Sequence, residues 1–288
     1  MRSGGRFTMI RINTSLLVAG YCRHLEGITL RGGAWRSCEF PALCALLQHP
    51  EYGYLLFDTG YTPRFFSETR GWPFSLYRQI TPVHISPDET VVSQLAARNI
   101  AAEQIQTIML SHFHADHIGG VKDFPQARIF SSKTGFSAIR GLKGLRALRR
   151  GFLAKLLPED MQTRVSYIED QPSITLDAEF SPFTVGFDLY NDGSLIAIHL
   201  PGHAEGQFGL LFYDQQGMAT FLVADSCWSS LAFREYRLPH FLTYVIHHHR
   251  KAYQDTLFKL HTLYRRNPHI RIIPSHCGEI AHNLEREK

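Results

Sequence analysis

The sequence lacks several features that would assign a protein class at once. Its five cysteines are odd in number and include no Cys-x-x-Cys pair, which argues against a disulfide framework and against a cysteine-based structural zinc site. No apolar run approaches the roughly 18 residues that a membrane-spanning helix needs, and residues 15–20 are shorter than most signal-peptide cores. We therefore expect a cytoplasmic protein with reduced thiols, no export signal and no membrane span.

The chain also lacks a strong excess of one charge, with 30 Lys and Arg against 26 Asp and Glu over 288 residues. This balance does not indicate a nucleic-acid partner, and a nuclease would want a further basic, aromatic-rich domain for which the chain has no room. No internal repeat, low-complexity tract or flexible linker divides the sequence. We therefore expect one domain over residues 1–288, and a hydrophobic content of 44% allows it a large core.

Short apolar runs bounded by Gly, Pro and Asp predict strands. The predicted strands cover residues 9–19, 54–57, 107–110, 127–130, 195–200, 208–213, 220–223 and 270–273. One helix is predicted after Ser86, where Ser-Pro-Asp-Glu forms a capping box, and another over about 250–265, where apolar residues recur at helical spacing. Strands and helices mixed without strict alternation favour a sandwich in which helices cover stacked sheets.

A basic segment lies between residues 139 and 156, with six Lys and Arg residues and no acid. Its apolar residues recur at helical spacing, namely Leu142, Leu145, Leu148, Phe152 and Leu156. The pattern predicts a basic helical insertion at about 136–160, weakened by three glycines. Such a segment is either a solvated face over the core or a lid or landing site for an anionic ligand or a membrane.

Residues 111–120, Ser-His-Phe-His-Ala-Asp-His-Ile-Gly-Gly, place three imidazoles and a carboxylate directly after a predicted buried strand. His112 and His114 lie two apart, so on an extended segment they project to the same side and can bind one ion. Asp116 and His117 lie just beyond, where the following glycine pair permits a tight turn, so they suit a second ion. Imidazole nitrogen and carboxylate oxygen are ligands that zinc prefers. The stretch therefore predicts a metal site.

This stretch resembles the signature of the metallo-β-lactamase superfamily of hydrolases, and the resemblance continues over most of the chain in the expected order. Residues 57–60, Phe-Asp-Thr-Gly, resemble the family's early strand and turn, and His203 after Leu-Pro-Gly resembles its next ligand. Asp225 and His276, each at the end of an apolar run, resemble its bridging carboxylate and its last ligand. The resemblance implies an α+β fold, a four-layer αββα sandwich with metals at one rim of the sheets.

Carried over residue by residue, the resemblance implies two divalent metal ions, zinc first, with iron, manganese and cobalt left open. It assigns the first ion to His112, His114 and His203, the second to Asp116, His117 and His276, and the bridge to Asp225. A hydroxide between the ions would attack an ester-type carbonyl, and Asp116 would pass a proton to the leaving group. Asp58 resembles the family's buried aspartate beside the ligands, with a turn-forming role as its alternative.

Within the superfamily the chain resembles the lactonase branch, which cleaves acyl-homoserine lactones. That branch commonly places a tyrosine three residues after the bridging aspartate, whereas this chain has Trp228, an indole that donates only from nitrogen. The alternatives are a thioesterase of the glyoxalase II type, whose anionic tail the basic segment would hold, and a non-catalytic metal-binding sensor or interaction protein. We expect a small-molecule ester, lactone or thioester as partner, and a homodimer is left open.

Overall fold

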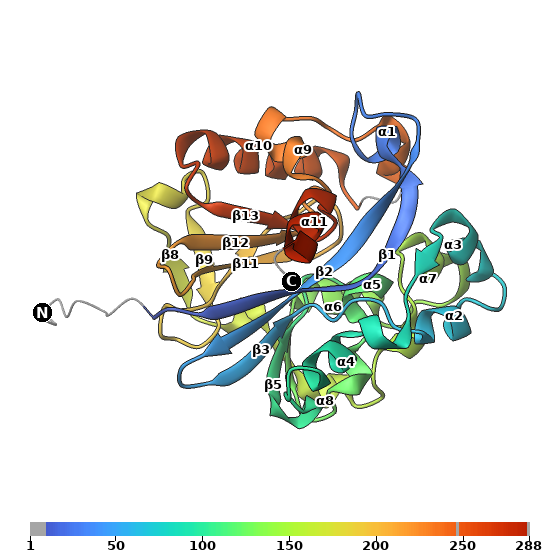
Figure 1. The fold of residues 1–288 in the computed structure, drawn as a ribbon, viewed down its shortest axis with the longest axis horizontal. Helices are drawn as coiled ribbons and strands as arrows, with labels where there is room; N and C mark the ends of the chain where they lie inside the picture. Colours follow the sequence, from blue (N-terminus) through green and yellow to red (C-terminus); the bar gives the residue numbers. More distant parts are fainter. Residues whose placement is uncertain (1–9, 246–247, 287–288) are drawn as a thin grey trace, which may run out of the picture.

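The computed structural model describes residues 10–245 and 248–286. Over these residues the chain forms two β-sheets packed face to face, with helices outside both (Figure 1). Seven described strands make the first sheet, in the order β4-β1-β2-β3-β5-β6-β7. Their bounds are β1 Asn13–Leu25, β2 Ser37–His49, β3 Gly53–Phe57, β4 Val83–His84, β5 Ile105–Met109, β6 Arg128–Ser131 and β7 Val165–Tyr167.

The second sheet contains six strands of the described chain, in the order β13-β12-β11-β10-β9-β8. Their bounds are β8 Ser173–Thr175, β9 Val185–Asp188, β10 Ile196–His199, β11 Phe208–Tyr213, β12 Ala219–Ala224 and β13 Arg271–Pro274. Both sheets are mixed, because β3, β5, β6 and β7 run parallel in the first and β12 and β13 run parallel in the second.

Helices lie on the outer face of each sheet (Figure 1). The α-helices are α1 Glu26–Thr29, α2 Arg64–Glu68, α3 Ser75–Ile80, α4 Val91–Ala96, α5 Ala115–Ile118, α6 Lys133–Ile139, α7 Gly144–Arg149, α8 Met161–Arg164, α9 Ser230–Glu235, α10 Arg250–Arg266 and α11 Gly278–Arg286. The 3₁₀ helices are η1 Pro87–Glu89, η2 Ala102–Gln104, η3 Val121–Asp123, η4 Ala154–Leu156, η5 Ile168–Asp170, η6 Ala178–Phe180 and η7 Phe241–Val245. None of these helices is both long and apolar enough to cross a membrane.

Three buried clusters separate the four layers, and the alternation of side chains along the strands produces them. On β5, Ile108 faces the helices while Met109 faces the second sheet. On β12, Leu222 points toward the first sheet while Phe221 and Val223 point toward α9 and α10. Because successive strand residues face opposite sides, a continuous apolar run fits a strand buried on both faces. The expected four-layer αββα sandwich is confirmed.

Most predicted strands are observed within two residues of their expected ends. The short strands β4, β7, β8 and β9 were not predicted, and neither was the long strand β2. It pairs with β1 over 13 residues and lies inside the first sheet. Pro41 within an apolar run argues against a central strand, because proline cannot donate to the ladder. In the structure Pro41 pairs with Tyr21 next to a register shift in β1, and this irregularity accommodates the proline.

The two predicted helices have different outcomes. The helix expected over 250–265 is α10, Arg250–Arg266. After Ser86 the capping box is present, since Glu89 Oε2 accepts from Ser86 N at 2.7 Å, yet the chain forms the single turn η1 and then a separate helix α4. The side chain of Thr90 caps α4, so a second cap interrupts the predicted helix.

The basic segment is not one helix. Residues 136–160 contain the end of α6, the six-residue α7 and the turn η4, separated by glycines in the left-handed region with φ of 71° at Gly141, 55° at Gly144 and 57° at Gly151. The predicted apolar stripe is therefore broken: Phe152 and Leu156 are buried, whereas Leu145 is 59% exposed.

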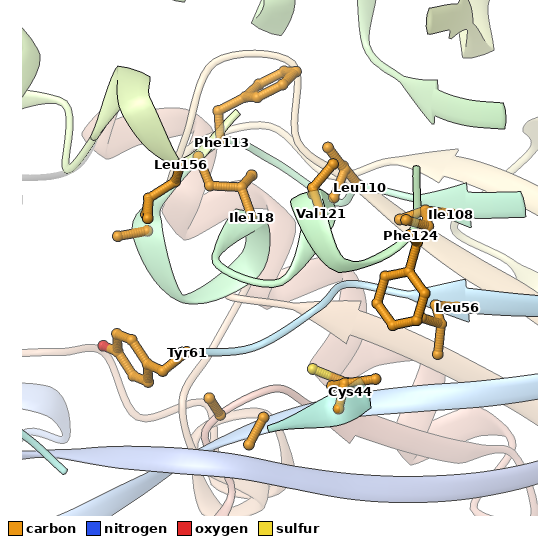
Figure 2. Packing of buried hydrophobic residues seen from close by; sticks show 14 of the residues in the cluster. Cys44, Leu56, Tyr61, Ile108, Leu110, Phe113, Ile118, Val121, Phe124 and Leu156 are labelled. Atoms are coloured by element: carbon orange, nitrogen blue, oxygen red, sulfur yellow. The ribbon is translucent and has the colours of Figure 1, made fainter. Parts of the chain in front are cut away.

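Short helices anchor the histidine-rich stretch to the first sheet (Figure 2). Ile118 of α5 and Val121 and Phe124 around η3 belong to the cluster that also contains Leu56 and Ile108 of the sheet. These side chains are fully buried, so the segment that follows His117 is fixed against the strands beneath it.

Candidate metal centre

Four strands from the two sheets end close to the predicted ligands. The loop after β5 carries His112 and His114, the loop after β10 carries His203, and Asp225 and His276 follow β12 and β13. Side chains at strand ends are held by a rigid sheet while the following loop leaves room for a ligand. Both sheets therefore contribute side chains to one place at their shared rim.

Helix α5 begins directly after His114 and presents Asp116 and His117. The glycines after it serve a different purpose from the tight turn predicted for them. Gly119 has an ordinary helical φ of −59°, but a Cβ there would lie 2.4 Å from the carbonyl oxygen of Gly60. Glycine is thus needed so that α5 can approach the turn after β3, where Thr59 N–H donates to His117 O at 2.9 Å.

All seven predicted ligands converge in the structure, in two groups that share Asp225. In each group the candidate ligand atoms lie within 4.8 Å of one another. The first group contains His112, His114, His203 and Asp225, and the second contains Asp116, His117, Asp225 and His276. This is the division that the family resemblance implies, and it supplies each candidate ion with side chains from both sheets.

A buried ring nitrogen without a partner shows that the site fits a cation. Nε2 of His112 has no hydrogen-bond partner among the described residues, although its side chain is only 1% exposed. Burial lowers the pKa of His112 well below its usual range, and the neighbouring His117 and His114 lower it further. Burial also lowers the pKa of His114 to about 4. The rings of His112 and His114 are therefore neutral, with lone pairs available to a metal ion.

Two aspartates, Asp116 and Asp225, place negative charge beside these neutral rings. Burial alone would raise the pKa of Asp225, but His276, His117 and His203 hold it well below its usual range. Burial alone would lower the pKa of His276, but the charge of Asp225 raises it to about 10. Two ionised carboxylates among five imidazoles form a donor set that suits zinc and also accepts iron, manganese or cobalt.

Asp58 lies directly behind the second group. Its Oδ2 is 2.7 Å from His117 Nδ1, and its Oδ1 accepts from Ser111 N–H at 2.8 Å. Asp58 is fully buried and has a left-handed φ of 60°, so the turn after β3 aims its carboxylate at the ring. A carboxylate on Nδ1 leaves Nε2 of His117 facing the cluster, which is how such groups orient metal-binding histidines.

Replacing Asp58 with asparagine is expected to lower metal affinity about 10- to 100-fold. The amide keeps an oxygen for Ser111 N–H but removes the negative charge that fixes the tautomer of His117. Competition with a chelator of known affinity measures the change. An unchanged affinity would mean that Asp58 serves only the turn.

A second orienting group could not have been found from residue type. His276 Nδ1 lies 2.7 Å from the carbonyl oxygen of Pro41, which can only accept a hydrogen bond. Nδ1 therefore carries the proton, and Nε2 faces Asp225 and Asp116. The contact joins residues 235 positions apart, and a backbone carbonyl leaves no signal in the sequence.

Trp228 closes one side of the cluster. Its Nε1–H donates to Asp225 Oδ2 at 3.2 Å, and its ring centroid lies 4.5 Å from that of His276 and 5.3 Å from that of Phe40. The indole thus holds the shared carboxylate and covers the imidazole beside it. The only hydrogen-bond donor of the Trp228 side chain is therefore already bound to the candidate ligand Asp225. The phenol that a tyrosine would place at this position is absent.

A pocket of about 270 Å³ opens onto the cluster and has mostly apolar walls. Its floor includes Asp116 and Asp225, and its walls include Ile28, Ile80, Leu148, Tyr61, Tyr77, Trp228 and Tyr253. Asp116, at 8% exposure, is the more accessible of the two floor carboxylates. The pocket suits a largely apolar ligand with one polar group placed over the cluster.

The basic segment packs against this pocket through Gly151, whose carbonyl accepts from Ala115 N–H at 3.1 Å. A Cβ at Gly151 would lie 3.0 Å from Cδ2 of His114. Gly151→Ala is expected to lower the activity of this centre about tenfold, because the ring of His114 must move. It should also destabilise the fold by about 1 kcal/mol, because alanine is strained at the left-handed φ.

Gly141→Ala is the matched control, since Gly141 has a similar φ of 71° but no atom within 4 Å of the point where a Cβ would lie. It should lose a similar amount of stability in thermal unfolding and keep its activity. Equal losses of activity in the two variants would mean that contact with His114 is not the cause.

Two sheets packed between helices, with histidines and aspartates gathered at one rim, define the metallo-β-lactamase fold. The family described as "Metallo-beta-lactamase superfamily" matches residues 39–217. The chain belongs to this superfamily.

Curated relatives include several proteins named N-acyl homoserine lactonase, AttM and AiiB among them. AttM of Azorhizobium caulinodans is 25% identical over 77% of this chain and 78% of its own length. AiiB of Agrobacterium fabrum is 23% identical over 68% of this chain and 66% of its own length.

Solved structures with this fold include an N-acyl homoserine lactone hydrolase with N-hexanoyl-L-homoserine bound at its catalytic metal centre. It has a TM-score of 0.70 at 16% identity and covers 96% of this chain and 97% of its own. AidC, a dizinc quorum-quenching lactonase, has a TM-score of 0.62 at 16% identity, with coverages of 94% and 89%. At such identities the likeness concerns the fold.

Proposed function

We propose that this protein is a hydrolase that depends on two metal ions, zinc first among them, and opens the ester bond of lactones. The observation that carries the proposal is the convergence of seven candidate ligands, six of them buried and His114 partly exposed, in two groups around the shared Asp225. Relatives named as N-acyl homoserine lactonases, with most of both chains aligned, support lactones as the substrate class.

Different residues of the chain would hold the two ions and orient the ligands. One ion would be held by His112, His114 and His203, the other by Asp116, His117 and His276, with Asp225 common to both. Metal ions bound there would supply a hydroxide near neutral pH and would polarise the substrate carbonyl. The hydrogen-bonding groups behind the rings fix the ligand orientations before substrate arrives, which lowers the cost of reaching the reactive geometry.

We assign the proton transfer to Asp116. Its Oδ2 lies 3.2 Å from His276 Nε2 and 3.4 Å from His117 Nε2, and it faces the pocket. Opening a lactone leaves an alkoxide that must be protonated. The ionised carboxylate of Asp116 would first accept the proton of the hydroxyl that has added to the carbonyl, and would then deliver that proton to the alkoxide. The apolar walls of the pocket exclude water from the acyl part of the substrate and orient it over the cluster.

Metal analysis of the purified protein, combined with hydrolysis rates for a homoserine lactone, an aryl ester and an acyl thioester, tests the proposal. We expect two zinc ions per chain and the highest kcat/KM for the lactone. Dominance of the thioester would establish the glyoxalase II type of activity instead, which the basic residues beside the pocket favour. Stoichiometric metal with no hydrolysis of any ester would favour a sensor or interaction protein.

A further inference from the structure

A second pocket, of about 420 Å³, lies beside the metal-site pocket. The two pockets share His114, Arg149 and His203 among their lining residues. The two pockets are therefore adjacent, close to the same candidate metal ligands. We call this second pocket the basic pocket, because Arg146 and Arg150 line it together with the shared Arg149.

Positive charge dominates the basic pocket. Three arginines line it, and Glu205 is the only acid among its described lining residues. Arg150 is already engaged, because its Nη1 lies 3.2 Å from Glu205 Oε2 and 3.0 Å from His248 Nδ1. The Arg150–Glu205 pair cancels one positive charge and ties the basic segment to the loop that carries His203. Two positive charges remain.

Those two charges belong to Arg146 and Arg149, three residues apart on α7. Side chains at this spacing lie on the same face of a helix. Within residues 10–245 and 248–286, no acid pairs with either guanidinium, although Lys155 of the same segment pairs with Glu68 and Lys133 with Asp170. Guanidinium groups gathered in a concave site recognise carboxylate or phosphate through paired hydrogen bonds.

We infer that the basic pocket binds an anionic group of the substrate, a carboxylate or a phosphate, while the scissile carbonyl lies at the metal ligands. The inference rests on the proposed function and narrows its substrate class to anionic esters. Phe113, Ile139 and Leu142 supply the apolar part of the pocket wall, so the anion is carried on an apolar chain or linker. The contribution appears in KM, because the anion lies away from the reacting atoms.

Two matched pairs of substrates show which side of the carbonyl carries the anion. The first pair is an N-acyl homoserine lactone whose acyl chain ends in a carboxylate and the methyl ester of the same compound. The second pair is the thioester of one acyl group with coenzyme A and the thioester of the same acyl group with N-acetylcysteamine, which is neutral. A preference of about fivefold or more in kcat/KM for the anionic member is expected in one pair, with a lower KM. No preference in either pair would overturn the inference.

Arg146→Gln tests the pocket, and Lys143→Gln is its matched control. Both remove one positive charge from an exposed position in the basic segment, but Lys143 does not line the pocket. Arg146→Gln should abolish most of the anion preference, and Lys143→Gln should retain it. If both variants lose it equally, the segment attracts anions by its overall charge and the pocket has no specific role.

Direct binding of 1-octanesulfonate, an anion that coordinates metal ions weakly, separates this inference from the proposed function. We expect the metal-loaded protein to bind it at least about fivefold more tightly than 1-octanol, and Arg146→Gln to weaken that binding about fivefold. Failure of lactone hydrolysis with this binding intact would contradict the proposed function alone. Hydrolysis of neutral lactones without sulfonate binding would contradict the basic pocket alone.

Discussion

Asp225→Asn is expected to remove both metal ions together and to lower kcat/KM for a lactone by about a thousandfold. The carboxylate reaches both ligand groups, since Oδ1 lies 3.3 Å from His117 Nε2 and Oδ2 lies 3.2 Å from His203 Nε2. An asparagine offers one oxygen in place of two and turns an amide N–H₂ toward one of the groups. Elemental analysis and steady-state kinetics on the same preparation measure the two effects.

Asp170→Asn is the control for this change, because Asp170 is exposed and pairs with Lys133 on the surface. Its metal content and kcat/KM should match those of the unmodified protein, and thermal unfolding should show that both variants are folded. Retention of one ion at full occupancy in Asp225→Asn would contradict the role of Asp225 as the residue that both ions share.

Asp116→Asn is expected to lower kcat for a lactone about 10²- to 10⁴-fold while most of the metal remains bound. Asparagine keeps an oxygen near His276 Nε2, where the Asp116 carboxylate lies at 3.2 Å, but it cannot carry a proton to the leaving group. Despite burial, His117 and His276 hold the pKa of Asp116 well below its usual range, so the carboxylate is ionised and able to accept the proton.

The leaving group distinguishes proton transfer from a purely ligating role. A nitrophenyl ester releases a stable phenolate that needs no proton, so Asp116→Asn should affect its hydrolysis far less than that of a lactone. Parallel kcat measurements on the two substrates, with metal content determined for each preparation, give the comparison. Equal losses for the two substrates would contradict the proton transfer and leave Asp116 as a ligand only.

The local pattern of the sequence predicted many of the strands and the longest helix. The run 208–213 is β11 over the same residues, and α10 exceeds its predicted range by one residue. These elements combine strong periodicity with clear end signals, so neighbouring residues determine them. The spacing of His112, His114, Asp116 and His117 directly after such a strand predicted a metal site. The family resemblance supplied the other three candidate ligands, and they too lie just beyond strands, whose ends meet at a common rim.

The departures came from features that a local pattern does not contain. A bulge in the partner strand β1 accommodates Pro41, and positive φ at Gly141 and Gly144 divides the predicted basic helix. The contact from His276 to a distant backbone carbonyl depends on how the two sheets stack. The Arg150–Glu205 pair likewise joins segments 55 positions apart. Sequence patterns indicate which side chains can bind metal, but these tertiary contacts decide how they are oriented.

The seven candidate ligands come from both sheets: the loop after β5 belongs to the first, whereas His203, Asp225 and His276 follow strands of the second. An ion held between them would cross-link the two halves of the sandwich, in the way that a structural metal stabilises a small domain. Chelation would then loosen the packing of one sheet on the other as well as abolish turnover. The midpoint of thermal denaturation should therefore rise with free zinc concentration.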